Sequence, residues 1–369
     1  MGAEHPSQQE AAVAQETNSK AETAPSPDDA SKPDKPTEVS KPSWKYILKK
    51  TVREFSKDQC TDLAAALTYY TVLAIFPALL ALVSILGLVG QAESTTNALL
   101  DLVRQFAPAD AVKVIEGPIE QLTSSSTAGL ALIVGILGAL WSASGFVKAF
   151  GRSLNRIYEV EEGRPAWKLL PTQLLVTLVL VLMAAALMLM LVISGPIAEA
   201  IGNVIGLGSE AVTIWNIAKW PIMVIFAVLI IAVLYYTTPN VKQPTFRWMS
   251  MGSLIALVIL AIVTLGFSFY VANFGNYNAT YGAIGGVIVL LLWIWLANVS
   301  LLFGAEFDAE VERGRELQAG IQAEESVQLP PRDTRQTEKR QEQEEKDIAE
   351  GRKLRQQHAG KDYDDDLHE

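Results

Sequence analysis

Side chains that commonly perform catalysis or bind metals are scarce in the middle of this chain. The three histidines, His5, His358 and His368, lie near the two ends, and the only cysteine is Cys60. A Ser-His-Asp or Cys-His arrangement needs a histidine beside its nucleophile, and a zinc site needs several His or Cys ligands. The sequence therefore predicts no catalytic residue, no metal site and no cofactor. A site made of carboxylates or lysine alone stays open.

Four charged residues stand where apolar segments begin or end, and they could form ion pairs. Asp62 precedes the first long apolar segment, Lys148 and Arg152 follow the second, and Glu306 follows the last. We hypothesise that Asp62 or Glu306 pairs with Lys148 or Arg152 and so latches three helices together at one membrane surface. The alternative is a set of separate, solvated helix-end charges, which contribute about 0–1 kcal/mol as exposed pairs.

The apolar segments contain no charged residue, and neutral polar and aromatic side chains occur there instead. Ionisable groups inside a bilayer usually mark ion or proton pathways, so their absence argues against a proton pump or a carboxylate-lined channel. Two explanations stay open for the neutral groups, namely packing between helices and a substrate cavity near kinked helices. The candidates for either role are Tyr69, Tyr70, Pro77, Trp141, Ser142, Tyr281, Trp293 and Asn298.

The elements that must position these residues are marked by windows without Asp, Glu, Lys or Arg. A membrane-spanning helix needs about 20 apolar residues. The charge-free windows are 63–92, 121–147, 169–198, 220–241 and 248–305, and the last is long enough for two spans. We therefore predict an all-α, polytopic membrane protein, a bundle of six transmembrane helices. The spans are predicted near 62–90, 128–148, 170–194, 219–237, 250–272 and 283–305.

Lysine and arginine are unevenly distributed between the segments that join these spans. The loops expected on one side carry only Arg104, Lys113 and Lys219. The other side carries Lys41, Lys45, Lys49, Lys50, Arg53, Lys57, Lys148, Arg152, Arg156, Arg164, Lys168, Lys242, Arg247, Arg313 and Arg315. Because basic loops stay in the cytoplasm, we predict that both termini are cytoplasmic. On the opposite side, apolar residues with helical spacing over 97–122 predict two short amphipathic helices.

The two ends of the chain differ from its body in composition. Residues 1–40 carry a net charge of −5 and residues 320–369 carry another −5, which together make up the formal net charge of −10. Segments with few large apolar side chains and many charges do not bury enough surface to offset their ordering entropy. We therefore predict a disordered tail over 1–43, a six-helix transmembrane domain over 44–318 and a disordered, charged tail over 319–369.

Several segments resemble the YihY/BrkB family of bacterial inner-membrane proteins. They are DLAAALTYYTVLAIFPALLAL (62–82), LWSASGFVKAFGRSLNRIYEVEEGRPAW (140–167), YYTTPNVK (235–242) and YGAIGGVIVLLLWIWLANVSLLFGAEFDAEV (281–311). The resemblance covers about residues 45–312 and implies six spans in a bacterial cytoplasmic membrane. It implies no settled activity. An older ribonuclease label for the family does not fit a body that has no histidine and has carboxylates scattered over its loops.

Two functions from different classes fit these observations. The first is a transporter or flippase-like protein for lipids or other amphiphiles, with a cavity lined by neutral polar and aromatic residues. The second is a non-catalytic membrane scaffold, whose acidic tails would dock envelope proteins. The expected partners are membrane lipids, an amphiphilic substrate and envelope proteins, and no nucleic acid. Neither a substrate nor an oligomeric state follows from the sequence.

Overall fold

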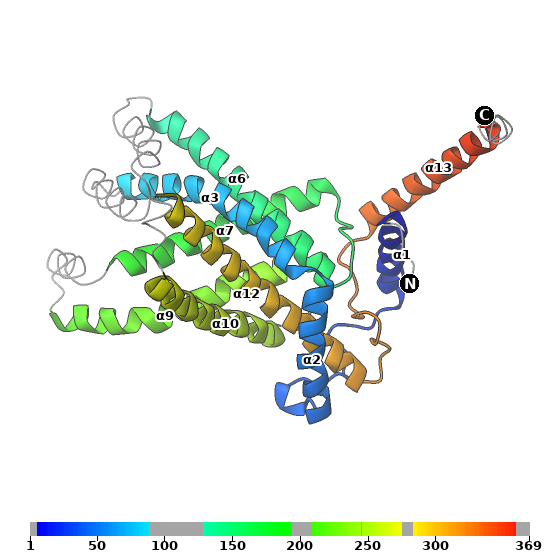
Figure 1. The fold of residues 1–369 in the computed structure, drawn as a ribbon, viewed down its shortest axis with the longest axis horizontal. Helices are drawn as coiled ribbons and strands as arrows, with labels where there is room; N and C mark the ends of the chain where they lie inside the picture. Colours follow the sequence, from blue (N-terminus) through cyan, green and yellow to red (C-terminus); the bar gives the residue numbers. More distant parts are fainter. Residues whose placement is uncertain (1–5, 89–127, 194–208, 245, 275–282, 359–369) are drawn as a thin grey trace.

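The structure is a computed structural model that describes residues 6–88, 128–193, 209–244, 246–274 and 283–358 (Figure 1). Within these residues every regular element is a helix, which confirms the all-α fold class. The helices are α1 (Pro6–Thr23), the short 3-10 helix η1 (Pro36–Glu38), α2 (Lys41–Lys57), α3 (Cys60–Leu88), α6 (Ala128–Ile157), α7 (Ala166–Val192), α9 (Ser209–Thr237), α10 (Phe246–Phe274), α12 (Ala283–Gln318) and α13 (Arg335–His358).

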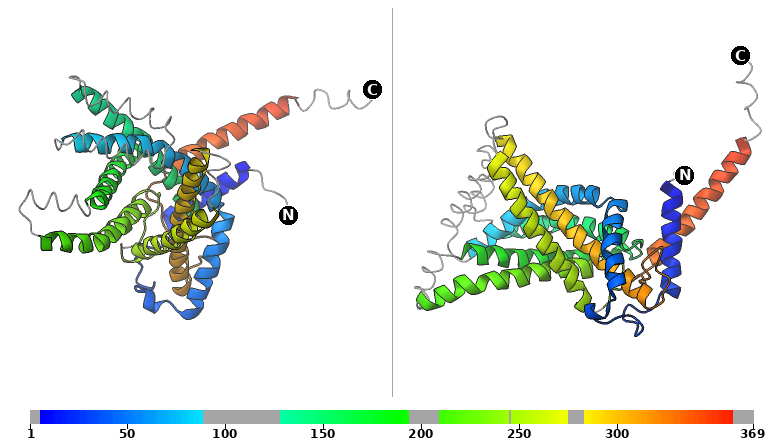
Figure 2. Two further views of the ribbon diagram at one scale, coloured as in Figure 1. Left: turned by 60° about the vertical axis from the view of Figure 1, so that its left-hand side comes forward. Right: turned by 60° about the horizontal axis from the view of Figure 1, so that its bottom comes forward.

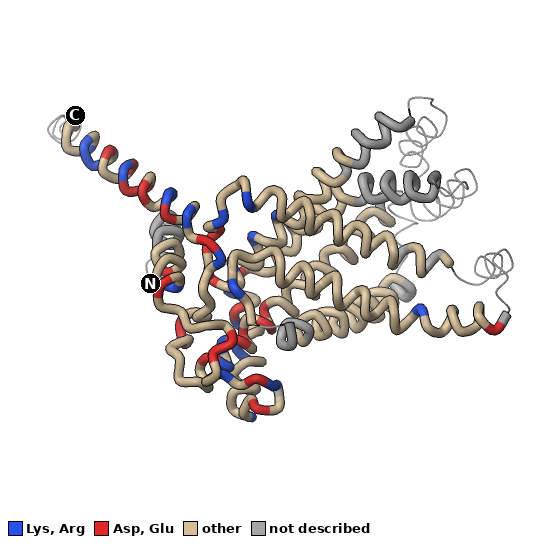
Figure 3. Tube along the Cα trace, turned by 180° about the vertical axis from the view of Figure 1, so that it is seen from behind, with Lys and Arg blue, Asp and Glu red and all other residues tan. Residues whose placement is uncertain are grey.

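The long helices form a ring. Helix α3 packs against α6, α6 against α7, α7 against α9, α9 against α10, α10 against α12, and α12 against α3. The views in Figures 1 and 2 show that these helices converge where α1, α2 and α13 lie and diverge toward the opposite side. We call the convergent side the charged end, because most Lys, Arg, Asp and Glu residues of the described chain gather there (Figure 3).

Four helices of the ring are long and apolar enough to cross a membrane. The candidate spans are Ala166–Leu187, Glu210–Thr237, Met251–Val271 and Gly286–Gln318, and each overlaps a span predicted from the sequence. Large apolar side chains such as Leu182, Ile262, Leu265 and Phe269 are 53–72% exposed on the outside of the ring. Exposed apolar surface of this extent is typical of contact with lipid. The chain is therefore a membrane protein with several candidate transmembrane helices.

The tightest packing lies toward the charged end, where helices that are distant in the sequence meet. Phe150 of α6 and Tyr235 of α9 stack with ring centroids 6.0 Å apart, and both side chains are buried. The Tyr235 hydroxyl donates to the backbone carbonyl of Leu301 on α12. Because aromatic stacking and a buried hydroxyl both require particular geometry, this core fixes how α6, α9 and α12 meet.

Helices α10 and α12 approach each other closely at a pair of glycines. A Cβ atom on Gly304 would lie 2.5 Å from the carbonyl oxygen of Gly252, so no larger residue fits without movement. The backbone N–H of Gly252 donates to Asp308 Oδ1 over 2.8 Å. Small residues at such crossings allow helix backbones to pack closely in membranes.

The prediction that both tails are disordered is wrong for the described residues. Helices α1 and α13 pack against each other, and Asn18 Nδ2 donates to Gln341 Oε1 over 2.6 Å. Lys32 is buried and pairs with Glu312 and Glu316 of α12, at 2.9 and 3.4 Å. Apolar residues of the tails, such as Val39, Val327 and Leu329, are buried against the body as well. These contacts are with residues distant in the sequence, so composition alone did not reveal the order of the tails.

Helix α12 also continues well past the predicted end of the last span at residue 305. Its final turns, from Glu306 to Gln318, are charged and pack against α2 and the tails. We call residues 319–334, which lead from α12 to α13, the strap. The predicted helices over 97–122 lie outside the described residues.

Candidate functional site

An apolar groove lies between α3 and α12. Its volume is about 520 Å³. It is lined by Ala65, Thr68, Tyr69, Val72, Ile288, Leu291, Leu292 and Trp295. Tyr69 is 61% exposed, so the groove is open at the surface of the described helices. A site of this kind can accept an apolar chain from the side.

Neutral hydrogen-bonding groups border the groove. Asn298 Nδ2 donates to Thr68 Oγ1 over 3.4 Å and to the backbone carbonyl of Ile294 over 3.1 Å. Trp295 Nε1 donates to the carbonyl of Thr61 over 3.1 Å, which ties α12 to the first turn of α3. Asn298 is buried, so its amide stabilises the contact between the two helices and leaves the groove itself largely apolar.

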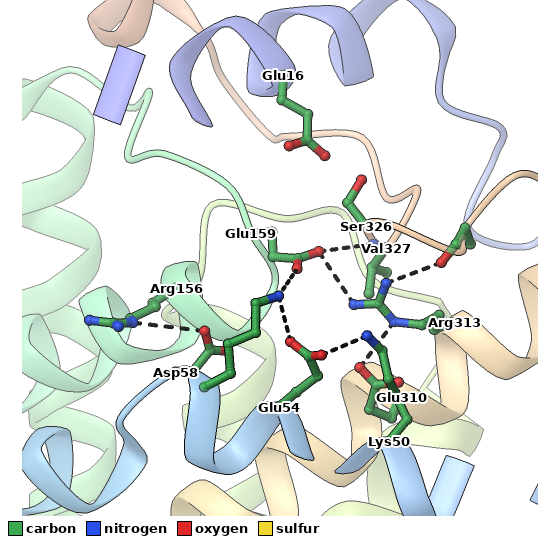
Figure 4. A network of polar contacts seen from close by, with 12 residues as sticks. Glu16, Lys50, Glu54, Asp58, Arg156, Glu159, Glu310, Arg313, Ser326 and Val327 are labelled. Carbon is green, nitrogen blue, oxygen red and sulfur yellow. Dashed lines mark hydrogen bonds and ion pairs between the residues drawn. The ribbon is translucent and has the colours of Figure 1, made fainter. Parts of the chain in front are cut away.

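A cluster of charged residues joins α2, the end of α6 and α12 at the charged end (Figure 4). Glu54 of α2 accepts from Lys50 over 2.6 Å and from Lys57 over 2.8 Å. Glu159, after α6, accepts from Arg313 of α12 over 3.4 Å. The charged cluster, as we use the term, consists of Lys50, Glu54, Lys57, Asp58, Arg156, Glu159, Glu310 and Arg313. Because the cluster contains both basic and acidic residues, their charges partly compensate each other.

The surroundings shift the pKa values of this cluster in different directions. Burial acts to raise the pKa of Glu54, but the hydrogen bonds from Lys50 and Lys57 outweigh it, and the pKa lies below its usual value. Burial and the nearby Glu159 carboxylate raise the pKa of Asp58 to about 6, although Arg156 lies 3.8 Å away. Asp58 is therefore one carboxyl of the cluster whose ionised form is poorly compensated.

The strap and α1 also form hydrogen bonds with residues of the charged cluster. Arg313 donates to the carbonyl of Ala323 over 3.1 Å, and the Val327 N–H donates to Glu159 Oε2 over 3.2 Å. Lys20 of α1 donates to the backbone carbonyl of Glu159 over 3.1 Å. Glu159 has a left-handed backbone, with φ of 53°, and this turn presents both its carbonyl and its carboxylate to these donors. The charged end is thus closed by segments from both ends of the chain.

A second polar network surrounds Asn240, between α9 and α10. Its backbone N–H donates to Asn155 Oδ1 over 2.7 Å, and its side-chain amide donates to the carbonyls of Glu161 and Asp333 over 2.8 and 2.9 Å. Gly163 lies so close to the strap that a Cβ atom there would be 1.9 Å from the Asp333 carbonyl oxygen. Asn155 and Asn240 both belong to sequence segments that suggested the family resemblance, and the structure brings those segments together.

Two carboxylates of α12 are buried in positions that sequence reasoning missed. Glu306 is 1% exposed and accepts from the thiol of Cys60 over 3.9 Å, and Asp308 accepts from the Gly252 backbone. Glu306 had been expected at a helix end, either in an ion pair or solvated, because it follows the charge-free window directly. The helical spacing of Gly304 and Asp308 was the available signal, since it places a carboxylate one turn after a close-packing glycine.

The structure locates most of the predicted cavity residues. Tyr69 lines the groove, Asn298 borders it, and Tyr70 packs against Gly145 of α6 instead. Trp141 is 61% exposed on α6, Ser142 donates to the carbonyl of Leu73 over 3.4 Å, and Trp293 is 37% exposed outside the groove lining. Tyr281 and the side chain of Pro77 lie outside the described residues.

The predicted latch does not form between the residues proposed for it. Among the described residues, no ion pair joins Asp62 or Glu306 to Lys148 or Arg152. Asp62 is exposed. Lys148 lies over the Trp141 ring at 4.6 Å, and Arg152 lies 6.0 Å from the Tyr70 ring, so both cations contact aromatic faces. The charged cluster joins α2, the end of α6 and α12 instead, and in it Asp58 faces Arg156.

The side chains of these two sites offer apolar surface and paired charges. Within the described residues, no group of three or more His, Cys, Asp or Glu side chains is arranged to hold a metal ion. The carboxylates of the charged cluster are occupied by lysine and arginine partners, and the groove offers apolar surface. The arrangement can hold an amphiphilic molecule and can fasten the helices at one end.

Comparison with known proteins gives consistent matches over most of the chain. The family model described as "Virulence factor BrkB" matches residues 51–328. The putative ribonuclease-like protein YfkH of Bacillus subtilis (strain 168) is 31% identical over 271 residues, which are 73% of this chain and 97% of the relative. A UPF0761 membrane protein of Alkalilimnicola ehrlichii is 31% identical over 259 residues, 69% of this chain and 55% of the relative.

A third relative extends beyond this chain in the same way. A UPF0761 membrane protein of Xanthomonas campestris pv. campestris (strain B100) is 29% identical over 286 residues, 76% of this chain and 62% of the relative. The chain therefore spans less than two thirds of the length of both UPF0761 relatives. No solved structure matches it significantly.

Proposed function

The chain belongs to the virulence factor BrkB family, and on this premise we propose that it binds lipids or similar amphiphiles in the α3–α12 groove and moves them across a bilayer. The observation that carries the proposal is the groove itself. Its volume of about 520 Å³ falls within the roughly 300–1,000 Å³ typical of small-molecule sites. Its lining is apolar and it opens sideways, which suits an acyl chain that enters from the surrounding lipid.

The proposed setting is a bacterial cytoplasmic membrane that six helices cross, with both termini in the cytoplasm. This is supported by the ring of long helices, of which α3 and α6, at 29 and 30 residues, have lengths comparable to the others. It is also supported by the accumulation of lysine and arginine at the charged end, because basic segments remain cytoplasmic.

Lipid transfer in reconstituted vesicles tests the proposal. Purified protein in phospholipid vesicles should speed the exchange of a fluorescent phospholipid between leaflets relative to empty vesicles. Ala65→Phe, which fills the groove, should slow this exchange at least several-fold. The matched control is Ala261→Phe, the same change at an exposed position of α10 away from the groove. Exchange no faster than in empty vesicles, or equal exchange by both variants, would refute transport through this groove.

A scaffold function is the second candidate, and α13 favours it. This helix has 24 residues, is mostly exposed and projects from the charged end (Figure 1). Its mixed charges would suit reversible docking of an envelope protein. Removal of residues 335–369 distinguishes the two functions. The truncated protein should still exchange lipids if the groove performs the function.

We do not propose an enzymatic activity, a cofactor or a nucleic-acid partner. One relative is named ribonuclease-like. RNA hydrolysis requires a metal-binding carboxylate cluster or a histidine acid–base pair, whereas residues 41–319 of this chain contain no histidine. Hydrolysis of RNA by the purified protein, abolished by a single substitution in the body, would contradict this proposal.

A further inference from the structure

The outer face of α2 carries a row of basic residues that the rest of the described protein does not use. Lys41, Lys45, Lys49 and Arg53 recur every four residues, so they lie along one face of the helix. All four are exposed. Among the described residues none of them forms an ion pair. Four uncompensated cations in a row make this face strongly positive.

Two exposed aliphatic side chains lie beside this basic row. Leu48 is 57% exposed and Val52 is 61% exposed, and each precedes a basic residue of the row. The row of cations and aliphatic side chains therefore forms one continuous stripe, which we call the basic stripe (Lys41, Lys45, Leu48, Lys49, Val52 and Arg53). A stripe of this composition is typical of helices that lie in the headgroup region of a membrane.

The opposite face of α2 is fixed firmly to the protein. Ile47 is fully buried and packs against Gly314, where a Cβ atom would meet its side chain at 2.6 Å. Trp44 stacks on Phe307 of α12 with ring centroids 6.3 Å apart. Ser40 caps the helix by accepting from the Ser43 N–H over 3.2 Å. The basic stripe is thus held in one place rather than on a loose tail.

The orientation of α2 also suits a membrane surface. It runs across the charged end of the ring, at a wide angle to the helices that form the ring (Figures 1 and 2). Figure 3 shows that the charged residues begin at this level, where the long uncharged stretches of the ring end. A helix in this position, across the spanning helices, lies in the plane of the bilayer surface.

We propose that the basic stripe of α2 binds the headgroups of anionic phospholipids in the leaflet at the charged end, with Leu48 and Val52 against the acyl boundary. Anionic lipids are the occupants that match its charge and its place at the bilayer surface. Each lysine or arginine near an anionic surface strengthens binding by roughly five-fold. This proposal does not depend on transport through the α3–α12 groove.

Titration of the full-length protein in mild detergent, with bound lipids counted by native mass spectrometry, tests the proposal. Phosphatidylglycerol is the anionic probe and phosphatidylcholine the zwitterionic comparison. A variant with Lys41, Lys45, Lys49 and Arg53 each changed to Gln should bind phosphatidylglycerol at least ten-fold more weakly, with phosphatidylcholine binding unchanged. The matched control changes the four exposed cations Lys346, Arg352, Lys353 and Arg355 of α13 to Gln and should bind like the unmodified protein.

Two outcomes would overturn the proposal. One is equal loss of phosphatidylglycerol binding in both four-residue variants, which would mean that only net charge matters. The other is unchanged binding in the α2 variant. If that variant does not fold, Lys45→Gln with Lys49→Gln replaces it and should still weaken phosphatidylglycerol binding several-fold, and no loss in this pair would equally refute the proposal.

Discussion

Arg313 illustrates how a single side chain organises the charged end. It is 1% exposed, and its guanidinium donates to Glu310 over 3.0 Å, to Glu159 over 3.4 Å and to the Ala323 carbonyl over 3.1 Å. These partners belong to α12, to the segment after α6 and to the strap. A guanidinium has five donors in a fixed plane, whereas a lysine has a single point charge. The planar guanidinium of Arg313 therefore joins three segments from one buried position.

Asp58 leads to a prediction about the pH dependence of stability. Its pKa rises from 3.8 to about 6 in the folded protein because of burial and the nearby Glu159. Below pH 3.8 such a carboxyl is protonated in both the folded and the unfolded protein, so it does not change the free energy of unfolding. As the pH rises to about 6, the carboxyl ionises more readily in the unfolded protein, and the fold is progressively destabilised. Asp58→Asn should therefore increase stability by roughly 1–3 kcal/mol at pH 8 and by little at pH 4.

Thermal unfolding in detergent at the two pH values measures this effect. Asp62→Asn is the matched control, since Asp62 is exposed at the start of α3. As a substitution at the surface, it should change stability by less than about 0.5 kcal/mol at either pH. A gain from Asp58→Asn that is as large at pH 4 as at pH 8 would show that ionisation of Asp58 does not destabilise the fold.

At the scale of elements, the strap depends on close contact with the segment between α6 and α7. Gly163 has no room for a Cβ atom, which would lie 1.9 Å from the Asp333 carbonyl oxygen. Gly163→Ala should push the strap away and destabilise its attachment by roughly 1–3 kcal/mol. We expect the amide hydrogens of residues 323–334 to exchange at least ten-fold faster in this variant.

The same substitution at Gly351 provides the control. No atom lies within 4 Å of a Cβ built there, and the residue is in the middle of α13. Gly351→Ala should leave exchange in the strap unchanged and should stabilise α13 by roughly 0.5–1 kcal/mol, because alanine has the higher helix propensity. Equal exchange in the strap of both variants would mean that Gly163 does not set its position.

At the scale of the whole molecule, the two ends of the ring should face different compartments. Glu210 lies in the first turn of α9, which starts at the divergent side (Figure 1), and Lys242 follows the other end of α9, at the charged end. Both residues are exposed. In a Cys60→Ser background, Glu210→Cys should react with a membrane-impermeant maleimide in intact bacterial cells, because its end of α9 is predicted to face outward. Lys242→Cys should react only after the cells are broken. The reverse pattern would invert the proposed topology.

Much of the architecture was determined by the sequence alone. The four apolar stretches found in the described helices overlap predicted spans, and the family assignment followed from segments that the family model also covers. The length and polarity of an apolar stretch are local properties, and the membrane imposes the same length on every spanning helix. For that reason a single sequence was sufficient to predict these elements.

The pairing of charges was decided only by the tertiary structure. Arg313 and Glu159 are 154 positions apart, and Lys32 and Glu312 are 280 apart. No sequence pattern near either residue indicates that the two meet. The latch was predicted with Asp62, whereas in the structure Asp58 pairs with Arg156. The order of the tails was missed for the same reason, because their stability comes from partners on α12 rather than from their own composition.

The groove was likewise foreseen only in part. Tyr69 and Asn298 were identified from the sequence as neutral groups in an apolar segment, and the structure places both at the α3–α12 contact. Ile288, Leu291 and Leu292, which line the groove, are indistinguishable in the sequence from the other aliphatic residues of α12. Which face of an evenly apolar helix meets a neighbour and which meets lipid depends on how the helices pack, so only the assembled ring defines the groove.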